Sequence, residues 1–206
     1  MNLAFLIPMM IFLTAAQRPS VPDSRPVILA YGDSLTAGFG MPAGSAYPDQ
    51  LQRKLDELGY KYRVVNMGIS GDTTSGGIAR LQAGLARKPS IVVLELGAND
   101  GLRGVPVTQT KANLEEMVVA FRNIGATVIM AGMTLPRNYG SAYVKSFENV
   151  FIDLATKYRL PLIPFFLEGV AGQPRLTLPD FLHPNADGYR VVVDIVMKTL
   201  SPLLKK

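Results

Sequence analysis

A serine at the end of an apolar run and a single histidine are the residues of this chain that could form a nucleophilic site. Ser34 follows the apolar run 27–31 through Gly32 and Asp33, and small or polar residues come directly after it. A serine hydroxyl attacks well only when a base removes its proton, a third group orients that base, and donors stabilise the oxyanion. His183 is the only histidine in the sequence, so a site of this kind requires His183 as its base.

A carboxylate stands close to this histidine in the sequence. Asp180 lies three residues before His183, in the segment 178–185. One loop could therefore hold the carboxylate against the ring, where it would fix the tautomer and stabilise the imidazolium that forms during attack. The alternative is that Asp180 is a turn residue and His183 a surface residue before Pro184, which is the usual explanation of an isolated Asp-x-x-His pair.

Two other segments could supply donors to an oxyanion. The glycine-rich segment 66–74 could present bare backbone N–H groups, although a plain turn followed by a helix cap is the simpler explanation of that segment alone. Asn99, in the segment Gly97–Gly101, follows another apolar run and carries a side-chain amide with two donors. Asn-Asp-Gly is also ordinary turn chemistry, so each segment by itself is ambiguous.

The elements that would position these residues alternate between strand-like and helix-like patterns. Short runs rich in Val, Ile and Leu predict strands at 27–31, 62–66, 91–96, 127–131 and 162–165. Apolar stripes predict helices around Leu55, Leu81, Met117, Phe151 and Val193. Repeated βα units imply a single α/β domain with a doubly wound parallel sheet and right-handed crossovers.

This fold would bring the candidate residues together. Ligands of doubly wound sheets bind beyond the carboxyl ends of the strands. The serine, the glycine-rich segment, the asparagine and the Asp-His pair all follow predicted strands, so they would meet at one edge of the sheet. Each supplies a different part of a nucleophilic site.

With these motifs in this order, the sequence resembles the GDSL, or SGNH, hydrolases over nearly the whole chain that follows the N-terminal segment. The matching blocks are Gly32–Leu35, Gly71 within Ile69–Asp72, Gly97–Asp100 and Asp180–Pro184. The flanking runs resemble the branch that contains periplasmic acyl-CoA thioesterase I, arylesterase and lysophospholipase, namely Glu95–Gly104, Leu135–Gly140 and Pro164–Phe166.

The resemblance implies roles for these residues. Ser34 would be the nucleophile, His183 the base and Asp180 the carboxylate that orients it. The N–H groups of Ser34 and Gly71 and the amide of Asn99 would form the oxyanion hole, with Gly68 as a rival for the glycine. The implied fold is a three-layer α/β/α sandwich around a flavodoxin-like sheet of five strands, and the mechanism requires neither a metal nor a cofactor.

The resemblance also implies the class of substrate. The expected activity is acyl transfer to water from small acyl esters and thioesters, namely fatty-acyl thioesters, aryl esters and lysophospholipids. Apolar residues in loops that follow strands could line an acyl groove, or could simply anchor their loops: Leu102, Val105, Leu135, Pro136 and Phe166. A carbohydrate or peptidoglycan O-acetyl esterase would use the same catalytic residues, and a non-catalytic binding module on the same fold is a further alternative.

Composition and motifs exclude several other classes. The formal net charge is +5, but the basic residues are scattered except for Lys205–Lys206, so no nucleic-acid partner is expected, and we expect a monomer. The absence of cysteine excludes disulfides and thiolate catalysis. Thr36 stands where the Gly-x-Ser-x-Gly turn of α/β-hydrolases needs glycine. A lone histidine excludes a His-x-x-x-His zinc site.

The N-terminus predicts export. Leu3–Leu13 is almost wholly apolar and small residues precede Gln17, a pattern typical of a secretory signal peptide cleaved after Ala16, although no basic residue precedes the run. The run is shorter than the about 20 residues of a spanning helix, so no membrane span should remain after cleavage. We therefore expect a signal peptide at 1–16, a linker at 17–25, a hydrolase domain at 26–206 and a periplasmic or secreted protein. An uncleaved N-terminal anchor is the alternative.

Overall fold

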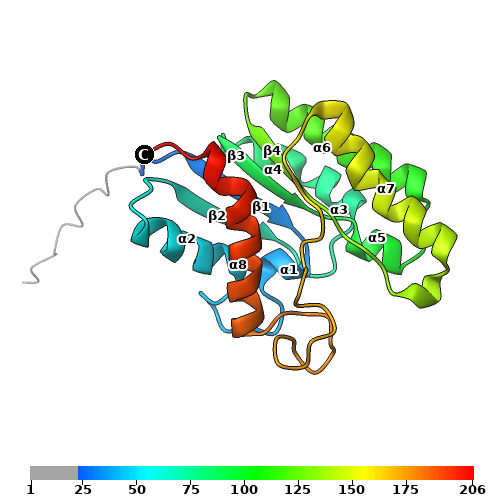
Figure 1. Ribbon diagram of the computed structural model, residues 1–206. Helices are drawn as coiled ribbons and strands as arrows, with labels where there is room; N and C mark the ends of the chain where they lie inside the picture. Colours follow the sequence, from blue (N-terminus) through cyan, green and yellow to red (C-terminus); the bar gives the residue numbers. More distant parts are fainter. Residues whose placement is uncertain (1–22) are drawn as a thin grey trace, which may run out of the picture.

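The centre of the molecule is a parallel five-stranded sheet with the order β2-β1-β3-β4-β5 (Figure 1). The computed structural model describes residues 23–206, so the expected signal peptide and most of the expected linker lie outside the described residues. The strands are β1 (Val27–Gly32), β2 (Arg63–Gly68), β3 (Ile91–Glu95), β4 (Thr127–Ala131) and β5 (Leu162–Ile163). The predicted α/β class and the flavodoxin-like sheet are confirmed.

The burial of the strands follows their place in the sheet. Every residue of β1 and β3 is buried, because these central strands are covered on both faces. The edge strand β2 is only half-buried. The last strand is shorter than predicted, because Pro164 has no N–H to donate to a ladder and the chain leaves the sheet there.

Helices cover both faces of the sheet and complete three layers (Figure 1). One face carries α2 (Tyr47–Glu57) and α8 (Ala186–Leu200), which pack against each other. The other face carries α6 (Val107–Asn123) and α7 (Ser141–Tyr158), together with the short α3 (Thr74–Ala79) and α4 (Leu81–Leu85). Gly59 and Gly125 follow the ends of α2 and α6 with φ of 79° and 86°, the left-handed conformation that stops a helix.

The stripe predicted as one helix around Leu81 is two short helices that break at Arg80. The guanidinium of Arg80 donates to Asp72 Oδ2 and to the carbonyl oxygens of Met67 and Gly32, and it lies 4.0 Å from the ring centroid of Tyr31. These contacts tie the loop after β2 to the end of β1. The interruption therefore contributes to the edge of the sheet where the candidate residues lie.

Short helical turns begin directly after strands and carry candidate residues. α1 (Ser34–Ala37) follows β1 and α5 (Ala98–Leu102) follows β3. Two 3₁₀ turns complete the elements, η1 (Arg137–Tyr139) and η2 (Ser201–Leu203). No helix within residues 23–206 has the length and apolar character needed to cross a bilayer.

Candidate active site

Ser34 is the first residue of α1, at the carboxyl end of a central strand. The carboxylate of Asp33 caps this helix by accepting a hydrogen bond from the Leu35 N–H at 3.0 Å. Gly68 of β2 lies directly beneath α1, where a Cβ would stand 2.1 Å from the backbone nitrogen of Ala37. The capped turn and the bare glycine together fix Ser34 at the edge of the sheet.

A tight loop holds the histidine and its carboxylate. Residues 178 and 183 close the loop through a hydrogen bond from the Leu178 N–H to the His183 carbonyl oxygen at 2.7 Å. Within it, Asp180 Oδ1 accepts hydrogen bonds from the N–H groups of Leu182 and His183, both at 2.9 Å. Phe181 stands at the tip with φ of 58°. The loop thus determines the position of both side chains through its own backbone.

The structure brings Ser34, His183 and Asp180 into one hydrogen-bonded series. His183 Nε2 lies 2.9 Å from Ser34 Oγ, and His183 Nδ1 lies 2.7 Å from Asp180 Oδ2. Burial tends to raise the pKa of Asp180, but hydrogen bonds from His183 and Leu182 outweigh it and lower that pKa, so the carboxylate stays ionised. The ring of Phe39 lies 4.6 Å from the His183 ring, centroid to centroid, and restricts where the imidazole can turn.

The three groups proposed for the oxyanion hole come from the segments that follow β1, β2 and β3. The Ser34 N–H belongs to the first residue of α1 and so has no acceptor within the helix. Gly71 lines the cavity beside Ser34 with φ of 79°, and the described residues include no acceptor for its N–H. The rival Gly68 donates its N–H to Asn66 Oδ1 at 2.9 Å. Gly71 is therefore the better placed of the two glycines.

Asn99 is held by two acceptors. Its Nδ2 donates to the Asp72 carbonyl oxygen at 2.9 Å and to Asp33 Oδ2 at 3.1 Å. These bonds fix the amide beside Ser34 before any substrate arrives, which is how preorganised donors act. An oxyanion at this position would share an amide hydrogen with the Asp33 carboxylate.

A buried pair of carboxyl groups lies beneath the nucleophile. Glu95 Oε2 accepts hydrogen bonds from Thr36 Oγ1 at 2.8 Å and from the Asp33 N–H at 3.3 Å, and both acidic side chains are almost inaccessible. Burial raises the pKa of Asp33 to about 6, and burial together with the Asp33 charge raises the pKa of Glu95 well above its ordinary value. Gly32 is necessary here, since a Cβ would lie 2.5 Å from Glu95 Oε2. No sequence signal indicated a role for Glu95, because an acid at the end of a strand has no distinctive spacing.

A second missed acid joins two loops of the site. Asp100, which is fully buried, accepts hydrogen bonds from the N–H of Thr74 at 2.8 Å and from its hydroxyl at 2.5 Å. Arg103 donates to the Gly71 carbonyl oxygen at 2.9 Å. Hydrogen bonds at Thr74 and at Gly71 therefore join the loop after β2 to the loop after β3. The only sequence signal for Asp100 and Arg103 was their closeness to Asn99 in the same motif.

The catalytic side chains open into a largely apolar cavity of about 390 Å³. Three residues predicted for an acyl groove line it, namely Leu102, Leu135 and Pro136. Two placements need correction. Phe166 is completely buried and packs edge-to-face against Tyr47, so its ring belongs to the core. Val105 is half-buried and does not line the cavity, and its carbonyl oxygen accepts a hydrogen bond from Tyr143.

Eight further residues line the cavity without a sequence pattern that indicates them. They come from all the loops that follow strands, and they are Leu35, Phe39, Ser70, Ala98, Met133, Thr134, Leu167 and Leu182. Apolar residues are so common in loops that only their closeness to motif residues could have indicated them; Leu182, for example, precedes His183 directly.

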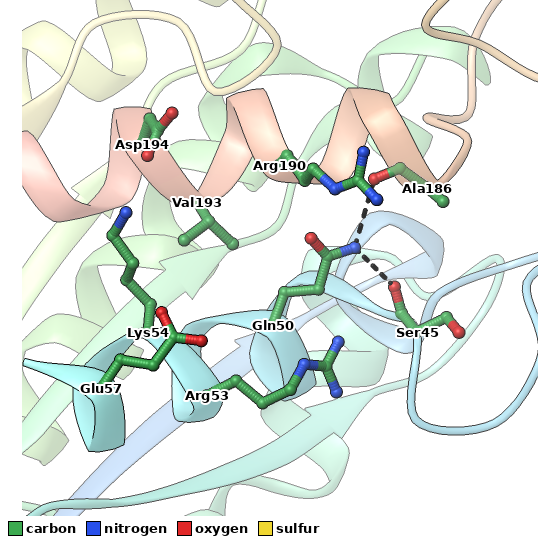
Figure 2. Close-up of a pocket in the computed structure, with 9 residues that line it drawn as sticks. All are labelled: Ser45, Gln50, Arg53, Lys54, Glu57, Ala186, Arg190, Val193 and Asp194. Carbon is green, nitrogen blue, oxygen red and sulfur yellow. Dashed lines mark hydrogen bonds between the residues drawn. The ribbon is translucent and has the colours of Figure 1, made fainter.

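A larger groove of about 510 Å³ lies apart from this site, between α2 and α8 (Figure 2). Its walls are mostly charged or polar, and they include Arg53, Lys54, Glu57, Arg190 and Asp194. At one end, Gln50 bridges the two helices by donating to the carbonyl oxygens of Ser45 and Ala186. None of the residues around Ser34 Oγ lines it, so the smaller apolar cavity is the candidate active site.

Comparison with known proteins gives the same assignment. Residues 30–191 match the GDSL-like Lipase/Acylhydrolase family. The chain is similar to "Esterase TesA" of Pseudomonas aeruginosa, at 44% identity over 86% of this chain and 89% of that protein. It is also similar to "Arylesterase" of Vibrio mimicus, at 40% identity over 84% and 87%. "Thioesterase 1/protease 1/lysophospholipase L1" of Escherichia coli is 37% identical over 96% and 93%.

Solved structures agree. A crystal structure of TesA superposes with a TM-score of 0.83 at 44% identity, covering 86% of this chain and 99% of that one. The esterase EstA from Pseudoalteromonas sp., in a structure described as inhibited by monoethylphosphonate, gives 0.82 at 33% identity, over 86% and 97%. The chain therefore belongs to the GDSL-like lipase and acylhydrolase family, and it is an enzyme that hydrolyses ester bonds.

Proposed function

We propose that the protein hydrolyses acyl esters and fatty-acyl thioesters through an acyl-enzyme on Ser34. One observation carries the proposal: the series Asp180–His183–Ser34, with contacts of 2.7 and 2.9 Å, ends at the mouth of an apolar cavity. A hydroxyl that can lose its proton to a bonded imidazole is positioned for nucleophilic attack. An apolar cavity beside it suits the acyl part of a substrate.

The proposed reaction has two stages. Ser34 Oγ attacks the acyl carbon while His183 Nε2 takes the hydroxyl proton, and the ionised Asp180 stabilises the imidazolium. The N–H groups of Ser34 and Gly71 and the amide of Asn99 bind the oxyanion of the tetrahedral intermediate. His183 then gives its proton to the leaving thiolate or alkoxide. In the second stage His183 activates a water, which releases the acid and restores the serine.

The walls of the cavity favour an acyl chain over a sugar. Nine of the side chains that line it are aliphatic, aromatic or thioether groups or proline, and the polar ones are chiefly those of the catalytic series and its donors. A sugar ring would bury hydroxyl groups there without partners, which is costly. The relatives named as a thioesterase, an arylesterase and a lysophospholipase agree with this substrate class.

The decisive experiment compares Ser34→Ala with wild type on p-nitrophenyl esters of increasing chain length. Ser34→Ala should lower kcat by on the order of 10⁴-fold or more, because no other nucleophile is bonded to the imidazole. Ser45→Ala, in the separate groove between α2 and α8, is the matched control and should keep full activity. Equal rates from Ser34→Ala and wild type would overturn the proposal.

A second comparison tests the acyl cavity. Leu102→Ala should raise KM for esters of eight or more carbons, while KM for the acetate stays the same, because Leu102 lines the cavity. Val105→Ala also shortens an apolar side chain, but Val105 does not line the cavity, so this control should change neither value. The same effect of Leu102→Ala at every chain length would contradict an acyl site at this wall.

We further propose that residues 26–206 form a single hydrolase domain, which acts as a monomer and without a nucleic-acid partner. Residues 1–16 would be removed on export to the periplasm or the medium. The apolar run followed by small residues before Gln17 supports this. The mass and N-terminal sequence of the secreted enzyme test the cleavage, and sedimentation tests the monomer. A product that keeps residue 1 would favour the anchor.

A further inference from the structure

Exposed apolar side chains gather at the mouth of the catalytic cavity. Within residues 23–206, five of the eight large apolar side chains that are exposed come from loops around this cavity, and we call these five the rim: Phe39, Ile69, Tyr139, Phe181 and Leu182. Their exposed fractions run from 37% to 57%. The other three, Leu58, Ile124 and Ile152, are scattered over helix ends and a helix surface.

The rim is tied to the cavity residue by residue. Phe39 and Leu182 line the cavity themselves. Ile69 and Phe181 directly precede the lining residues Ser70 and Leu182. The Tyr139 hydroxyl donates to the carbonyl oxygen of another lining residue, Leu102, at 3.0 Å. The rim residues therefore come from the segments after β1, β2, β4 and β5, next to residues that line the cavity.

The fold does not require this exposure. Contiguous exposed apolar surface is unfavourable in water, and in folded proteins it marks a site of interaction. Phe181 is the clearest case, because a bulky residue is 57% exposed at the tip of its loop with φ of 58°. A left-handed conformation is strained for a bulky side chain. The loop therefore keeps an aromatic side chain exposed two residues before His183 in spite of the strain.

The charges around the rim indicate its partner. The loops that follow β3, β4 and β5 contribute three exposed basic residues, Arg103, Arg137 and Arg175. Among the carboxylates of these loops and of the loop after β2, Asp72 pairs with Arg80, Asp100 is fully buried and Glu168 lines a separate cavity. Asp180 stays ionised beside His183, so the three arginines outnumber it. The chain as a whole has a net charge of +5. An apolar ring with basic neighbours complements an anionic lipid surface.

We propose that the rim is a docking surface for anionic phospholipid bilayers, with its side chains inserted among the acyl chains and its arginines beside the phosphates. The cavity then opens toward the membrane, and an acyl chain reaches Ser34 without crossing water. Only this benefit rests on the proposed hydrolysis, since docking itself can be measured on a chain that has lost Ser34.

The absence of tryptophan gives a direct test of insertion. Because the sequence contains none, F181W and I152W each add one fluorescent reporter, at the rim and on the surface of α7. The probe is a vesicle of equal parts phosphatidylglycerol and phosphatidylcholine. Emission from F181W should shift to the blue and be quenched by brominated lipid, whereas emission from I152W should change in neither respect. The two variants have the same N-terminal segment. If the protein bound the vesicle through that segment alone, the tryptophan at position 181 would stay in water and its emission would not change.

A pair of double variants tests the affinity. Ile69→Ser with Phe181→Ser should weaken partition into these vesicles about tenfold or more, because two half-exposed apolar side chains are lost. Leu58→Ser with Ile152→Ser, matched in exposure, should leave partition unchanged. Hydrolysis of dissolved p-nitrophenyl acetate should be the same in both. Vesicles of phosphatidylcholine alone should bind wild type at least tenfold more weakly, since each basic residue near an anionic surface contributes about fivefold.

Several results would overturn the proposal. Emission from F181W that stays unchanged, or that shifts as much as emission from I152W, would show that the rim is not inserted. A blue shift that rises with protein concentration without lipid would mean that a second copy covers the rim. Equal binding to neutral and anionic vesicles would remove the charge argument. If Ser34→Ala keeps esterase activity while F181W inserts, the proposed mechanism falls and docking stands.

Discussion

Asp33 Oδ2 accepts a hydrogen bond from Asn99 Nδ2 at 3.1 Å, so the residue before the nucleophile also holds the amide proposed for the oxyanion. The other oxygen of the same carboxylate caps α1 through the Leu35 N–H. One buried side chain therefore fixes the position of Ser34 relative to Asn99. These two hydrogen bonds give a structural reason for an acid at position 33, although a negative charge next to the serine opposes an oxyanion.

Replacement of Asn99 should affect the chemical step more than binding. Asn99→Ala removes one oxyanion donor and should lower kcat roughly 10²–10³-fold with little change in KM. Steady-state kinetics on p-nitrophenyl butyrate check this. Asn138→Ala, in the exposed turn η1, is the control and should behave as wild type. A loss of less than threefold in Asn99→Ala would remove Asn99 from the oxyanion hole.

The carboxylate of Asp180 should matter through its charge and its acceptor. Asp180→Asn keeps the size of the side chain but cannot stabilise an imidazolium, and it should lower kcat on the order of 10³–10⁴-fold. Asp187→Asn, in the first turn of α8, should keep the wild-type kcat. Burst kinetics should show slower acylation in Asp180→Asn. An unchanged rate of acylation would mean that His183 is oriented by other contacts.

The buried carboxyl pair predicts an unusual dependence of stability on pH. The pKa of Asp33 is raised from 3.8 to about 6 and that of Glu95 is raised well above 4.5, so the folded state binds more protons than the unfolded state between these limits. The free energy of unfolding should therefore fall as pH rises from about 4, near the unfolded-state pKa values, through about 6 and above. Each unit of pKa difference corresponds to about 1.4 kcal/mol.

Glu95→Gln tests this dependence. The variant keeps an acceptor for Thr36 Oγ1 but places no charge beside Asp33, so urea unfolding should show a smaller difference between pH 5 and pH 8. Its stability at pH 8 should exceed that of wild type by about 1 kcal/mol. Glu116→Gln, on the exposed side of α6, should unfold as wild type does. A pH dependence that Glu95→Gln leaves intact would place its origin elsewhere.

Gly68→Ala should disturb the nucleophile from beneath. Its Cβ would lie 2.1 Å from the Ala37 nitrogen, so α1 must move, at a cost of about 1–3 kcal/mol in stability together with a loss of kcat. Gly44→Ala meets no atom within 4 Å, although its φ is 80°. This control should lose about 1–2 kcal/mol through strain alone and keep its kcat. Thermal unfolding and ester kinetics on both variants separate the two effects.

The arrangement of the sheet was predictable because its signals are local. Runs of β-branched and aliphatic residues indicate buried strands, and β4 has the predicted ends, 127–131. Strands joined by βα units run parallel, so their carboxyl ends meet at one edge of the sheet. The sequence alone therefore predicts that residues as distant as Ser34 and Asp180 lie at one edge.

The remaining features depend on contacts that leave no periodic signal. The break at Arg80 arises because its guanidinium reaches three acceptors on β1, β2 and the following loop. Phe166 and Leu135 are both apolar loop residues, yet Phe166 packs on Tyr47 in the core while Leu135 lines the cavity. The sequence indicates only that Glu95 ends a strand. Its contact with Asp33 and Thr36 depends on the space left by the missing side chain of Gly32. Contacts of this kind cannot be predicted from the spacing of residue types along the sequence.

The contact between Ser34 and His183 joins positions 149 residues apart. The serine is synthesised early, but its base belongs to a loop that follows all five strands in the sequence. Contacts of such long separation form slowly during folding. A nascent or unfolded chain therefore carries the nucleophile without the group that activates it. Export in an unfolded form would deliver an inert polypeptide, and hydrolysis would begin only where folding is completed.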